Sequence, residues 1–351
     1  MNELIQKYWK RILVIAPFYA ILWFLLLYPI NLYVQTPGGL TEVEHLISVD
    51  YNEDKVTEGT ISTTYIMSLN RPTFFEFMVG YLSKFSTYGV LSGSNLNYTN
   101  EEIVQISYLD KATSVDAAII VAYEAMEAID PSIHIEYHTE VLVYGKATYL
   151  SHYDEIAFGD EFVQMVGDGD VVVTDYSLIS ANTTTGESYE FTFLNADKES
   201  YTVSLTKDAT TSLFGVTLKT YYIVDGDETT PSYHQADSNI GGPSGGLLQT
   251  LAIYNMLSEE DITHGLKIAG TGTIAYGGNV GYIGGVKQKI ATAYLNHVDV
   301  FFIPFLNEDY YYDNYVEALR ACEELGIDPT GWLVPVATFQ DAIDYLAGLE
   351  D

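Results

Sequence analysis

The sequence predicts a mixed α/β protein with a β-rich segment in its middle and one long apolar helix near its N-terminus. Residues 210–351 alternate strand-like and helix-like patterns, and residues 135–209 hold short strands separated by turn residues. Residues 12–33 contain no charged side chain. The chain has 351 residues, of which 48% are hydrophobic, so it is long and apolar enough to bury a core in about two domains.

The charge balance excludes one large class of partners. The formal net charge is −33, from 48 acidic and 15 basic residues. Without a basic stripe to neutralise phosphates, we expect no binding to nucleic acid. An acidic surface favours cationic peptides through long-range attraction, although it equally serves simple solubility. Cys322 is the single cysteine, so an intrachain disulfide is excluded.

The apolar segment 12–33 is long enough to cross the hydrocarbon core of a bilayer as a helix. Cations precede it at Lys7, Lys10 and Arg11. No Lys or Arg follows until Lys55, so the positive-inside rule predicts a cytoplasmic tail at 1–11, a single-pass anchor at 12–33 and an extracellular remainder at the cell membrane. A cleaved signal peptide is the rival interpretation, but YVQTPGG offers no small-residue cleavage site.

The rest of the chain divides into three predicted parts. Residues 34–134 form a membrane-proximal α/β region with helices expected at 74–85 and 115–129. Residues 135–209 contain strands at 135–144 and 170–176, and the pair 189–195 and 200–206 predicts a hairpin. The Asp-rich run at 168–175 lacks the ligand order of an EF-hand loop, so we interpret it as a turn.

The third part, residues 210–351, predicts an α/β domain. Its strands are expected at 212–224, 265–274, 298–304 and 332–336. Its helices are expected at 244–257, 286–295, 313–325 and 339–349.

Ser244 stands between two glycine pairs in NIGGPSGGLLQTLAIYN, just ahead of an apolar helical pattern. Glycines allow a substrate chain to approach closely. The free N–H groups of a helix start could stabilise an oxyanion formed when Ser244 attacks a carbonyl. The alternative is that Ser244 is only an N-cap that follows a glycine-rich turn.

A serine nucleophile needs a base. The histidines are scattered, although a histidine such as His234 could still be brought to Ser244 by the fold. Lys287 in GYIGGVKQK begins an apolar helical pattern after a Gly-Gly turn. Burial would lower the pKa of its amine, which could then accept a proton from Ser244. Lys289 is two positions further on and is expected to point elsewhere.

Together, GGPSGG and GTGTIAYGGNVGYIGGVKQKIATAY resemble the proteolytic domain of the Lon protease family. The resemblance covers the third part of the chain, 210–351, and implies a Ser-Lys dyad of Ser244 and Lys287. It implies that backbone around Gly242, Pro243 and Gly245 holds the oxyanion and substrate, and that Thr271 supports the dyad. Lon-type domains often form hexameric rings, which leaves the oligomeric state of this chain open.

The chain departs from typical Lon proteins in ways that shape the expectation. No G-x-x-x-x-G-K-[ST] string is present, so we expect no ATP requirement. Gly241 stands three residues before the serine, where typical members have Asp. The predicted order of anchor, β-rich segment and protease resembles a membrane-anchored branch of Gram-positive surface peptidases. In that branch a PDZ domain occupies the place of residues 135–209.

The expected function is therefore an ATP-independent, membrane-anchored serine endopeptidase that cleaves extracellular peptides or proteins, with secreted signalling peptides as one substrate class. No metal or other cofactor is implied, since HExxH and cysteine clusters are absent from the sequence. Two alternatives stay open. One is a PDZ-based surface protein that binds peptides and carries an inert protease domain, and the other is a serine hydrolase that uses a histidine base.

Overall fold

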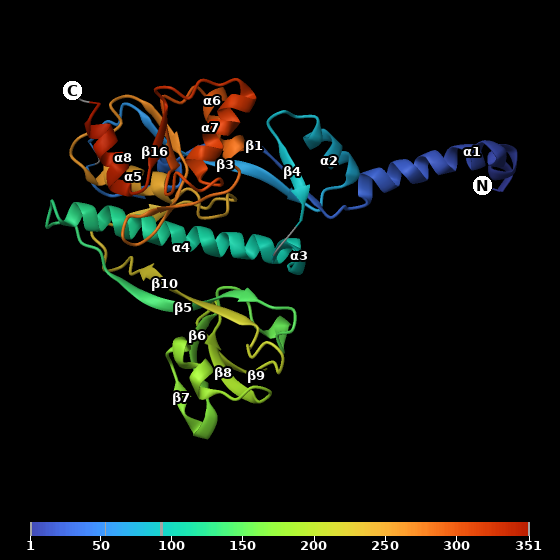
Figure 1. Cartoon of the computed structure of the whole chain (residues 1–351), viewed down its shortest axis with the longest axis horizontal. Helices are drawn as coiled ribbons and strands as arrows, with labels where there is room; N and C mark the ends of the chain where they lie inside the picture. Colours follow the sequence, from blue (N-terminus) through green and yellow to red (C-terminus); the bar gives the residue numbers. More distant parts are fainter. Residues whose placement is uncertain (1, 53, 92–93, 350–351) are drawn as a thin grey trace.

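The protein has two lobes that lie on either side of the long helix α4, Asn100–Glu127 (Figure 1). The computed structural model describes residues 2–52, 54–91 and 94–349. The upper lobe holds a mixed sheet covered by helices, and the lower lobe is an antiparallel sheet. The N-terminal helix α1, Asn2–Leu27, extends away from both lobes.

A six-stranded sheet in the order β16-β15-β12-β3-β1-β4 forms the centre of the upper lobe. Its strands are β1 Leu32–Glu42, β3 Thr60–Asn70, β4 Thr87–Val90, β12 Lys267–Gly270, β15 Val300–Pro304 and β16 Leu333–Val336. The strands from β16 to β3 pair in parallel, and β1 pairs antiparallel with both β3 and β4.

The region 34–134 is part of this sheet, which differs from the prediction of a separate membrane-proximal part. Its strand β3 pairs with β12 from Thr60↔Lys267 to Thr63↔Gly270. Sequence patterns detect local periodicity, and this pairing joins segments that lie far apart in the chain. Half of the strands of this six-stranded sheet therefore come from residues that carry no motif of their own.

Helices cover both faces of the sheet. These are α5 Gly246–Leu257 and α8 Phe339–Ala347 beside α4 on one face, and α6 Val286–Leu295 and α7 Asn314–Leu325 on the other. In β15, Phe302 packs with the α4, α5 and α8 side and Phe301 with the α6 and α7 side. Successive side chains of a strand point to opposite faces, which explains why the predicted buried strand at 298–304 is so largely apolar.

The lower lobe contains a six-stranded sheet, in which five strands follow the order β10-β5-β6-β8-β9 and β7 pairs with β6. Its strands are β5 Tyr137–Lys146, β6 Glu161–Val166, β7 Val172–Val173, β8 Ser188–Leu194, β9 Ser200–Thr206 and β10 Val216–Val224. The predicted hairpin is present as β8 and β9. The predicted strand at 170–176 shortens to β7, and β10 pairs with β5 instead of joining the sheet of the upper lobe. The lower lobe therefore continues past residue 209.

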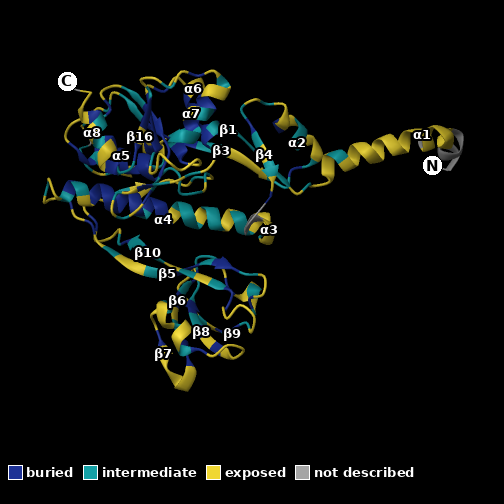
Figure 2. Cartoon of the chain, in the orientation of Figure 1, coloured by how far each residue is buried: buried dark blue, intermediate teal, exposed yellow. Residues whose placement is uncertain are grey.

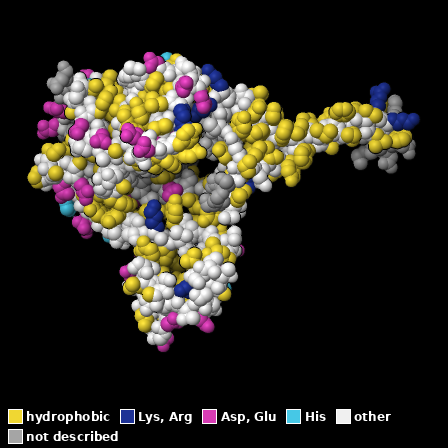
Figure 3. Space-filling view, viewed as in Figure 1, with side chains coloured by type: hydrophobic (Ala, Val, Ile, Leu, Met, Phe, Trp, Pro, Cys, Tyr) yellow, Lys and Arg dark blue, Asp and Glu magenta, His cyan; other side chains and the backbone are white. Residues whose placement is uncertain are grey.

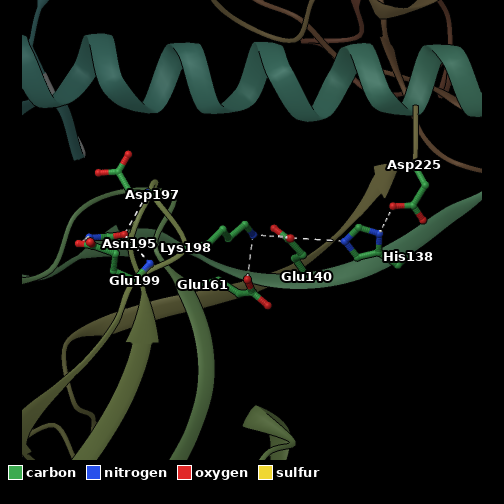
Figure 4. Close-up of polar contacts among 8 residues, drawn as sticks. All are labelled: His138, Glu140, Glu161, Asn195, Asp197, Lys198, Glu199 and Asp225. Atoms are coloured by element: carbon green, nitrogen blue, oxygen red, sulfur yellow. Dashed lines mark hydrogen bonds and ion pairs between the residues drawn. The ribbon is translucent and has the colours of Figure 1, made fainter. Parts of the chain in front are cut away.

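A charged network ties the strands of the lower lobe together just below α4 (Figure 4). Lys198, in the turn between β8 and β9, lies 2.6 Å from Glu140 of β5 and 3.0 Å from Glu161 of β6. His138 of β5 lies 2.8 Å from Asp225, at the end of β10. These contacts hold the hairpin tip and β10 to the central strands of the sheet.

Helix α4 is longer than predicted and reaches both lobes. A capping box between Thr99 and Glu102 starts it at Asn100, well before the predicted start at 115. Its Ala-rich second half is buried against α5, whereas its first half is partly exposed (Figure 2). The sequence pattern detects only the buried half because the first half lacks a continuous apolar stripe.

Short elements complete the fold. They are the helices α2 Phe74–Tyr81 and α3 Ser94–Asn97, and the strand pairs β2 Ile47–Val49 with β11 Tyr233–Gln235 and β13 Thr273–Ile274 with β14 Val280–Gly281.

The predicted anchor at 12–33 divides between two elements. Helix α1 ends at Leu27, and β1 begins at Leu32. Within residues 2–52, 54–91 and 94–349, no helix meets the length and hydropathy needed to cross a membrane. Apolar side chains of α1 such as Phe18 and Trp23 are nevertheless exposed, at 70% and 59%.

Candidate active site

The candidate site lies at the carboxyl end of β12, where two segments from opposite faces of the upper sheet meet. Ser244 ends the glycine-rich loop that leads into α5 on one face. Lys289 projects from the first turns of α6 on the other face. Thr271 follows directly after β12 and lies between them. The parallel sheet therefore brings together residues that are 45 positions apart.

The contacts among these three residues are short. Lys289 Nζ lies 2.7 Å from Ser244 Oγ. The same Nζ lies 2.7 Å from Thr271 Oγ1, which donates a 3.0 Å hydrogen bond to the Ser244 carbonyl. Thr271 therefore positions both partners, since it contacts the amine of one and the backbone of the other.

Burial controls the protonation of Lys289. Its side chain is 2% exposed, and loss of solvation lowers the pKa of its amine from an ordinary 10.5 to about 7. No acidic side chain in the described part of the chain forms an ion pair with it. A large fraction of Lys289 is therefore neutral near pH 7, and its lone pair can accept the proton of Ser244.

The Ser244 side chain does not cap a helix. The N-cap of α5 is Gly245, which is followed by the first helical residue Gly246. The hydroxyl of Ser244 faces Lys289 instead. Of the two interpretations of this serine, the geometry favours the nucleophile.

The base predicted from the sequence, Lys287, is wrongly placed for that role. Its Nζ lies 2.8 Å from Glu324 Oε2 of α7. Residues two positions apart on a helix point in widely different directions, at about 200° of rotation. Lys289 therefore faces the site, and Lys287 faces α7.

A signal for Lys289 was present in the sequence. Val286, Ile290 and Ala293 are fully buried and mark the inward face of α6 at the spacing i, i+4, i+7. Lys289 lies at i+3 on that face, and Lys287 does not. The G-G-V-K string favours Lys287 as the base, whereas the helical periodicity favours Lys289, in agreement with the structure.

Among the described residues, no histidine lines the cleft around Ser244. His234 on β11 lies 3.0 Å from Asp50 and is 67% exposed in its side chain. The expected alternative of a histidine base therefore has no geometric support in the described residues. The partner of the Ser244 hydroxyl is a lysine, Lys289.

The loop before Ser244 is held to α4. The Gly242 N–H donates a 2.7 Å hydrogen bond to the Ser107 carbonyl, and the Pro243 carbonyl accepts one of 3.0 Å from Ser114 Oγ. Gly242 has a φ of 88°, a left-handed conformation that glycine adopts without strain. The middle of α4, at Ser107 and Ser114, thus supports the loop that carries Ser244.

These bonds limit which backbone N–H groups are free to donate a hydrogen bond to an oxyanion. The Gly242 amide is already engaged by Ser107, and Pro243 has no N–H. The amides of Ser244 and Gly245 make no hydrogen bond within the described part of the chain. Of the three predicted residues, Gly242, Pro243 and Gly245, only Gly245 therefore has a backbone N–H available for an oxyanion in the described part of the chain. The Ser244 N–H is a second available donor.

Ser244 and Lys289 open into a cleft of about 820 Å³. One wall is the outer half of β3, from Thr63 to Asn70, and the other is the first half of α4, from Asn100 to Lys111. Beyond Thr63, the edge of β3 that faces away from β1 pairs with no strand in the described residues. The described lining includes no Asp or Glu. The cleft therefore combines an open strand edge with walls that lack acidic side chains, inside a strongly acidic protein.

Comparison with known proteins finds a family match for the segment that holds these residues. Residues 236–320 match the family described as the Lon protease (S16) C-terminal proteolytic domain. This segment is similar to a Lon-type proteolytic domain. The matched range includes Ser244, Thr271 and Lys289, so the three residues that meet in space lie within the Lon-type segment.

Three curated relatives agree with this match. The chain is 34% identical over 105 residues to a Lon protease of Mesomycoplasma hyopneumoniae (strain 232), covering 30% of this chain and 11% of the relative. It is 42% identical over 72 residues to a Lon protease of Ureaplasma parvum serovar 3, covering 20% and 9%. It is 40% identical over 67 residues to a Lon protease of Clostridium acetobutylicum, covering 19% and 8%. The chain thus spans about a tenth of the length of these relatives.

The match to a Lon-type proteolytic domain supports a serine peptidase, and the contact between Lys289 Nζ and Ser244 Oγ lies within the matched range. Across residues 2–52, 54–91 and 94–349, no group of three or more His, Cys, Asp or Glu side chains is placed to hold a metal ion.

Proposed function

We propose that the chain is an ATP-independent serine endopeptidase in which Ser244 is the nucleophile and Lys289 is the general base. The contact of 2.7 Å between Lys289 Nζ and Ser244 Oγ, inside a buried setting, carries this proposal. Neutral Lys289 accepts the Ser244 proton as the serine oxygen attacks a peptide carbonyl. The Ser244 and Gly245 amides stabilise the oxyanion.

In the following steps Lys289 acts first as a general acid and then again as a general base. Protonated Lys289 donates its proton to the leaving amine, and the peptide C–N bond breaks to give an acyl-enzyme on Ser244. Water then enters and attacks the acyl carbon while Lys289 accepts its proton, and Lys289 passes this proton to Ser244 Oγ as the ester bond breaks and the acid product leaves. Thr271 keeps the amine oriented throughout, because its Oγ1 lies 2.7 Å from Lys289 Nζ.

Substrate binds as an extended chain along the open edge of β3. Residues 64–70 offer backbone groups on that edge, and an added peptide strand would pair with them while its scissile bond reaches Ser244. The lack of Asp and Glu in the described lining favours neutral or apolar residues next to the scissile bond. Cationic flanks would be attracted by the surrounding acidic surface.

Independence from ATP is part of this proposal. The string nearest to a phosphate-binding loop ends at Gly145-Lys146-Ala147-Thr148 and has Glu140 where the upstream glycine would stand. The Lys146 amine is directed into the lower lobe, where it donates hydrogen bonds to the carbonyls of Ile156 at 2.8 Å and Tyr153 at 3.1 Å. This lysine is thus engaged in holding a loop.

The proposed location is the outer surface of a cell membrane, with the N-terminus cytoplasmic and α1 as the tether. The exposed apolar side chains of α1 and the cations Lys7, Lys10 and Arg11 before its apolar stretch support this proposal. Secreted peptides, signalling peptides among them, would then be the accessible substrates. Sedimentation with membranes after alkaline washing, compared between the full chain and a chain lacking 1–30, tests it.

The lower lobe is proposed to capture peptide termini in the manner of a PDZ domain. A pocket of about 370 Å³ lies beside residues 213–218, at the edge of the sheet where β10 has no outer neighbour among the described strands. The turns Tyr176–Leu178 and Ser180–Asn182 contribute to its lining. Lys207 also lies beside the pocket, but it is buried and its amine donates hydrogen bonds to the carbonyls of Thr183 at 2.9 Å and Ser180 at 3.3 Å and to Thr183 Oγ1 at 3.0 Å. Its positive charge would act on a terminal carboxylate only from beneath the lining.

The test of the protease uses the full chain in detergent or vesicles without nucleotide. It is mixed with secreted peptides of different length and charge, and the products are read by mass spectrometry. We expect cleavage by the wild type and none by Ser244→Ala. Turnover that survives in Ser244→Ala would refute the assignment, and a lack of cleavage by both proteins would leave peptide binding by the lower lobe as the function.

A further inference from the structure

Helix α2 and strand β4 present an apolar surface that the catalytic mechanism does not use. Its members, here called the α2 surface, are Phe74, Phe75, Val79, Leu82, Tyr88 and Val90. Their exposed fractions lie between 41% and 77%, which is unusual for so many large apolar side chains close together. In the space-filling view, hydrophobic side chains gather over α2 and continue along α1 (Figure 3).

The exposed apolar residues of α2 lie on one side of the helix. Gly80 is buried and faces Val34 of β1, so one side of the helix packs on the sheet. Phe75, Val79 and Leu82 follow the spacing i, i+4, i+7 and form a stripe away from that side. The helix is therefore apolar on both sides, and the described part of the protein covers one of them.

Contacts among aromatic rings hold β4 to the same surface. Tyr81 at the end of α2 and Tyr88 of β4 have ring centroids 5.0 Å apart. Phe77 packs edge-on against Tyr88 at 5.6 Å. The two elements thus form one rigid surface with aromatic rings at its margin, an arrangement that suits the boundary between hydrocarbon and water.

The charge of this region differs from that of the whole chain. Residues 72–98 contain one acidic side chain, Glu76, and one basic side chain, Lys84. Their net charge is zero, whereas the chain carries −33. An anionic bilayer would repel the acidic body of the protein but not this end of it.

The α2 surface is also fixed to the base of α1. The Ile30 N–H, shortly after α1 ends, donates a 2.9 Å hydrogen bond to the Pro72 carbonyl. Pro29 forms an isolated bridge with Thr73, the N-cap of α2. Where α1 enters a membrane, these bonds place α2 at the entry point.

We propose that the α2 surface docks into the interfacial layer of the lipid bilayer and holds the catalytic cleft beside the membrane. The inference rests on the membrane tether of the proposed function and extends it to substrate choice. Strand β3 lines the cleft through Leu69 and Asn70 and ends just before Pro72. The far end of the cleft thus adjoins the docked surface, and the preferred substrates are peptides that lie on the membrane or are anchored in it.

The first experiment measures where the α2 surface lies. The full chain is reconstituted into vesicles of phosphatidylcholine and phosphatidylglycerol, with an environment-sensitive dye on Phe75→Cys, on Leu82→Cys or on the control Val172→Cys in the lower lobe. The natural Cys322 is 1% exposed, so it does not compete for the label. We expect blue-shifted emission and quenching by doxyl-labelled lipid at positions 75 and 82, and neither at 172.

The other outcomes overturn the proposal in distinguishable ways. Dyes at 75 and 82 that stay water-exposed on vesicle-bound protein would refute docking and leave the tether intact. A chain that does not bind vesicles would refute both. Shielding that needs no lipid and grows with protein concentration would show that a second copy covers the surface.

The second experiment tests the consequence for substrates. One peptide is supplied either free in solution or with a palmitoyl chain that anchors it in the vesicle. The variant Phe75→Glu/Leu82→Glu should cleave the anchored peptide about tenfold more slowly than the wild type and the free peptide at the same rate, because only the anchored peptide depends on cleft position. The matched control Val171→Glu/Val172→Glu should change neither rate.

A loss of equal size on both peptides would refute the link between docking and substrate choice. Failure of the wild type to cleave either peptide would refute the proposed protease, and the dye measurements would still report on docking.

Discussion

Lys289 reaches Ser244 across the carboxyl end of β12, and its amine lies 2.7 Å from the serine oxygen although the two residues come from opposite faces of the sheet. Lys287, two positions earlier on the same helix, lies against Glu324. The two lysines form a natural pair for experiment because they share a helix and differ in direction.

Replacing Lys289 by Met should abolish most of the peptidase activity. The change removes the general base while it keeps the length and apolar stem of the side chain, so we expect kcat/KM to fall about 10²- to 10⁴-fold. Lys287→Met removes a solvent-facing ion pair and should change kcat/KM less than twofold, or about 0.4 kcal/mol. Kinetics on one short peptide compares both variants, and an equal loss in each would contradict the assignment of Lys289.

The rate should depend on pH through Lys289. Burial lowers the pKa of this amine to about 7, and only the neutral form accepts the Ser244 proton. We therefore expect kcat/KM of the free enzyme to fall about tenfold per pH unit on the acid side of pH 7 and to level off above it. A profile that stays flat down to pH 5 would mean that another group is the base.

Stability should depend on the same amine in a defined direction. The pKa of Lys289 is about 7 in the folded chain and 10.5 as its ordinary value, so the unfolded chain binds more protons between these limits. The free energy of unfolding then rises from pH 7 to pH 9, by about 2 kcal/mol for this one group, and falls again as the pH is lowered. Lys289→Met should lack this increment, which urea unfolding of both proteins at pH 7, 8 and 9 would measure.

Thr271 is expected to act as a positioning residue for the dyad. Thr271→Val keeps the shape but removes the oxygen that contacts Lys289 and the bond to the Ser244 carbonyl, so kcat should fall about tenfold with little change in KM. Thr292→Val is the matched control, because the hydroxyl of this buried threonine of α6 donates to the Gln288 carbonyl, away from the dyad. If both variants lose similar stability and only Thr271→Val loses kcat, the positioning role holds, whereas equal kcat values would contradict it.

The pocket of the lower lobe should matter for long substrates only. Leu213 lines this pocket and is 60% exposed, so Leu213→Asp should not harm folding. We expect KM to rise about tenfold for a long substrate with a free carboxyl terminus and to stay unchanged for a short peptide that fills only the cleft. An amidated long substrate should resemble the short one, and a uniform rise in KM would contradict capture by this lobe.

The local features of the site could be predicted well from the sequence, and its long-range features poorly. Ser244, the helices α5 and α6 and the buried strand β15 all follow from patterns within short stretches of the chain. The pairing of β3 with β12 does not, because a strand carries no mark of a partner that is distant in the sequence. The sequence alone therefore does not predict that residues Thr63 to Asn70 form a wall of the cleft.

The choice between the two lysines shows a different kind of error. The sequence held the answer in the spacing of Val286, Ile290 and Ala293, which places Lys289 on the buried face. The G-G-V-K motif that resembles the Lon family favours Lys287 instead. For α4, the capping box of Thr99 and Glu102 marked the true start, but the apolar pattern that predicted the helix lies further along it.

Because the site is built from segments that are distant in the sequence, its parts are synthesised at different times. A ribosome releases β1, β3 and α4 early, Ser244 later, and Lys289 only after β12 has followed. Until α6 emerges, the growing chain holds a cleft wall and a serine without a base. The proposed dyad can therefore form only after the chain has been synthesised as far as Lys289, a latency that follows from the order of these segments along the chain.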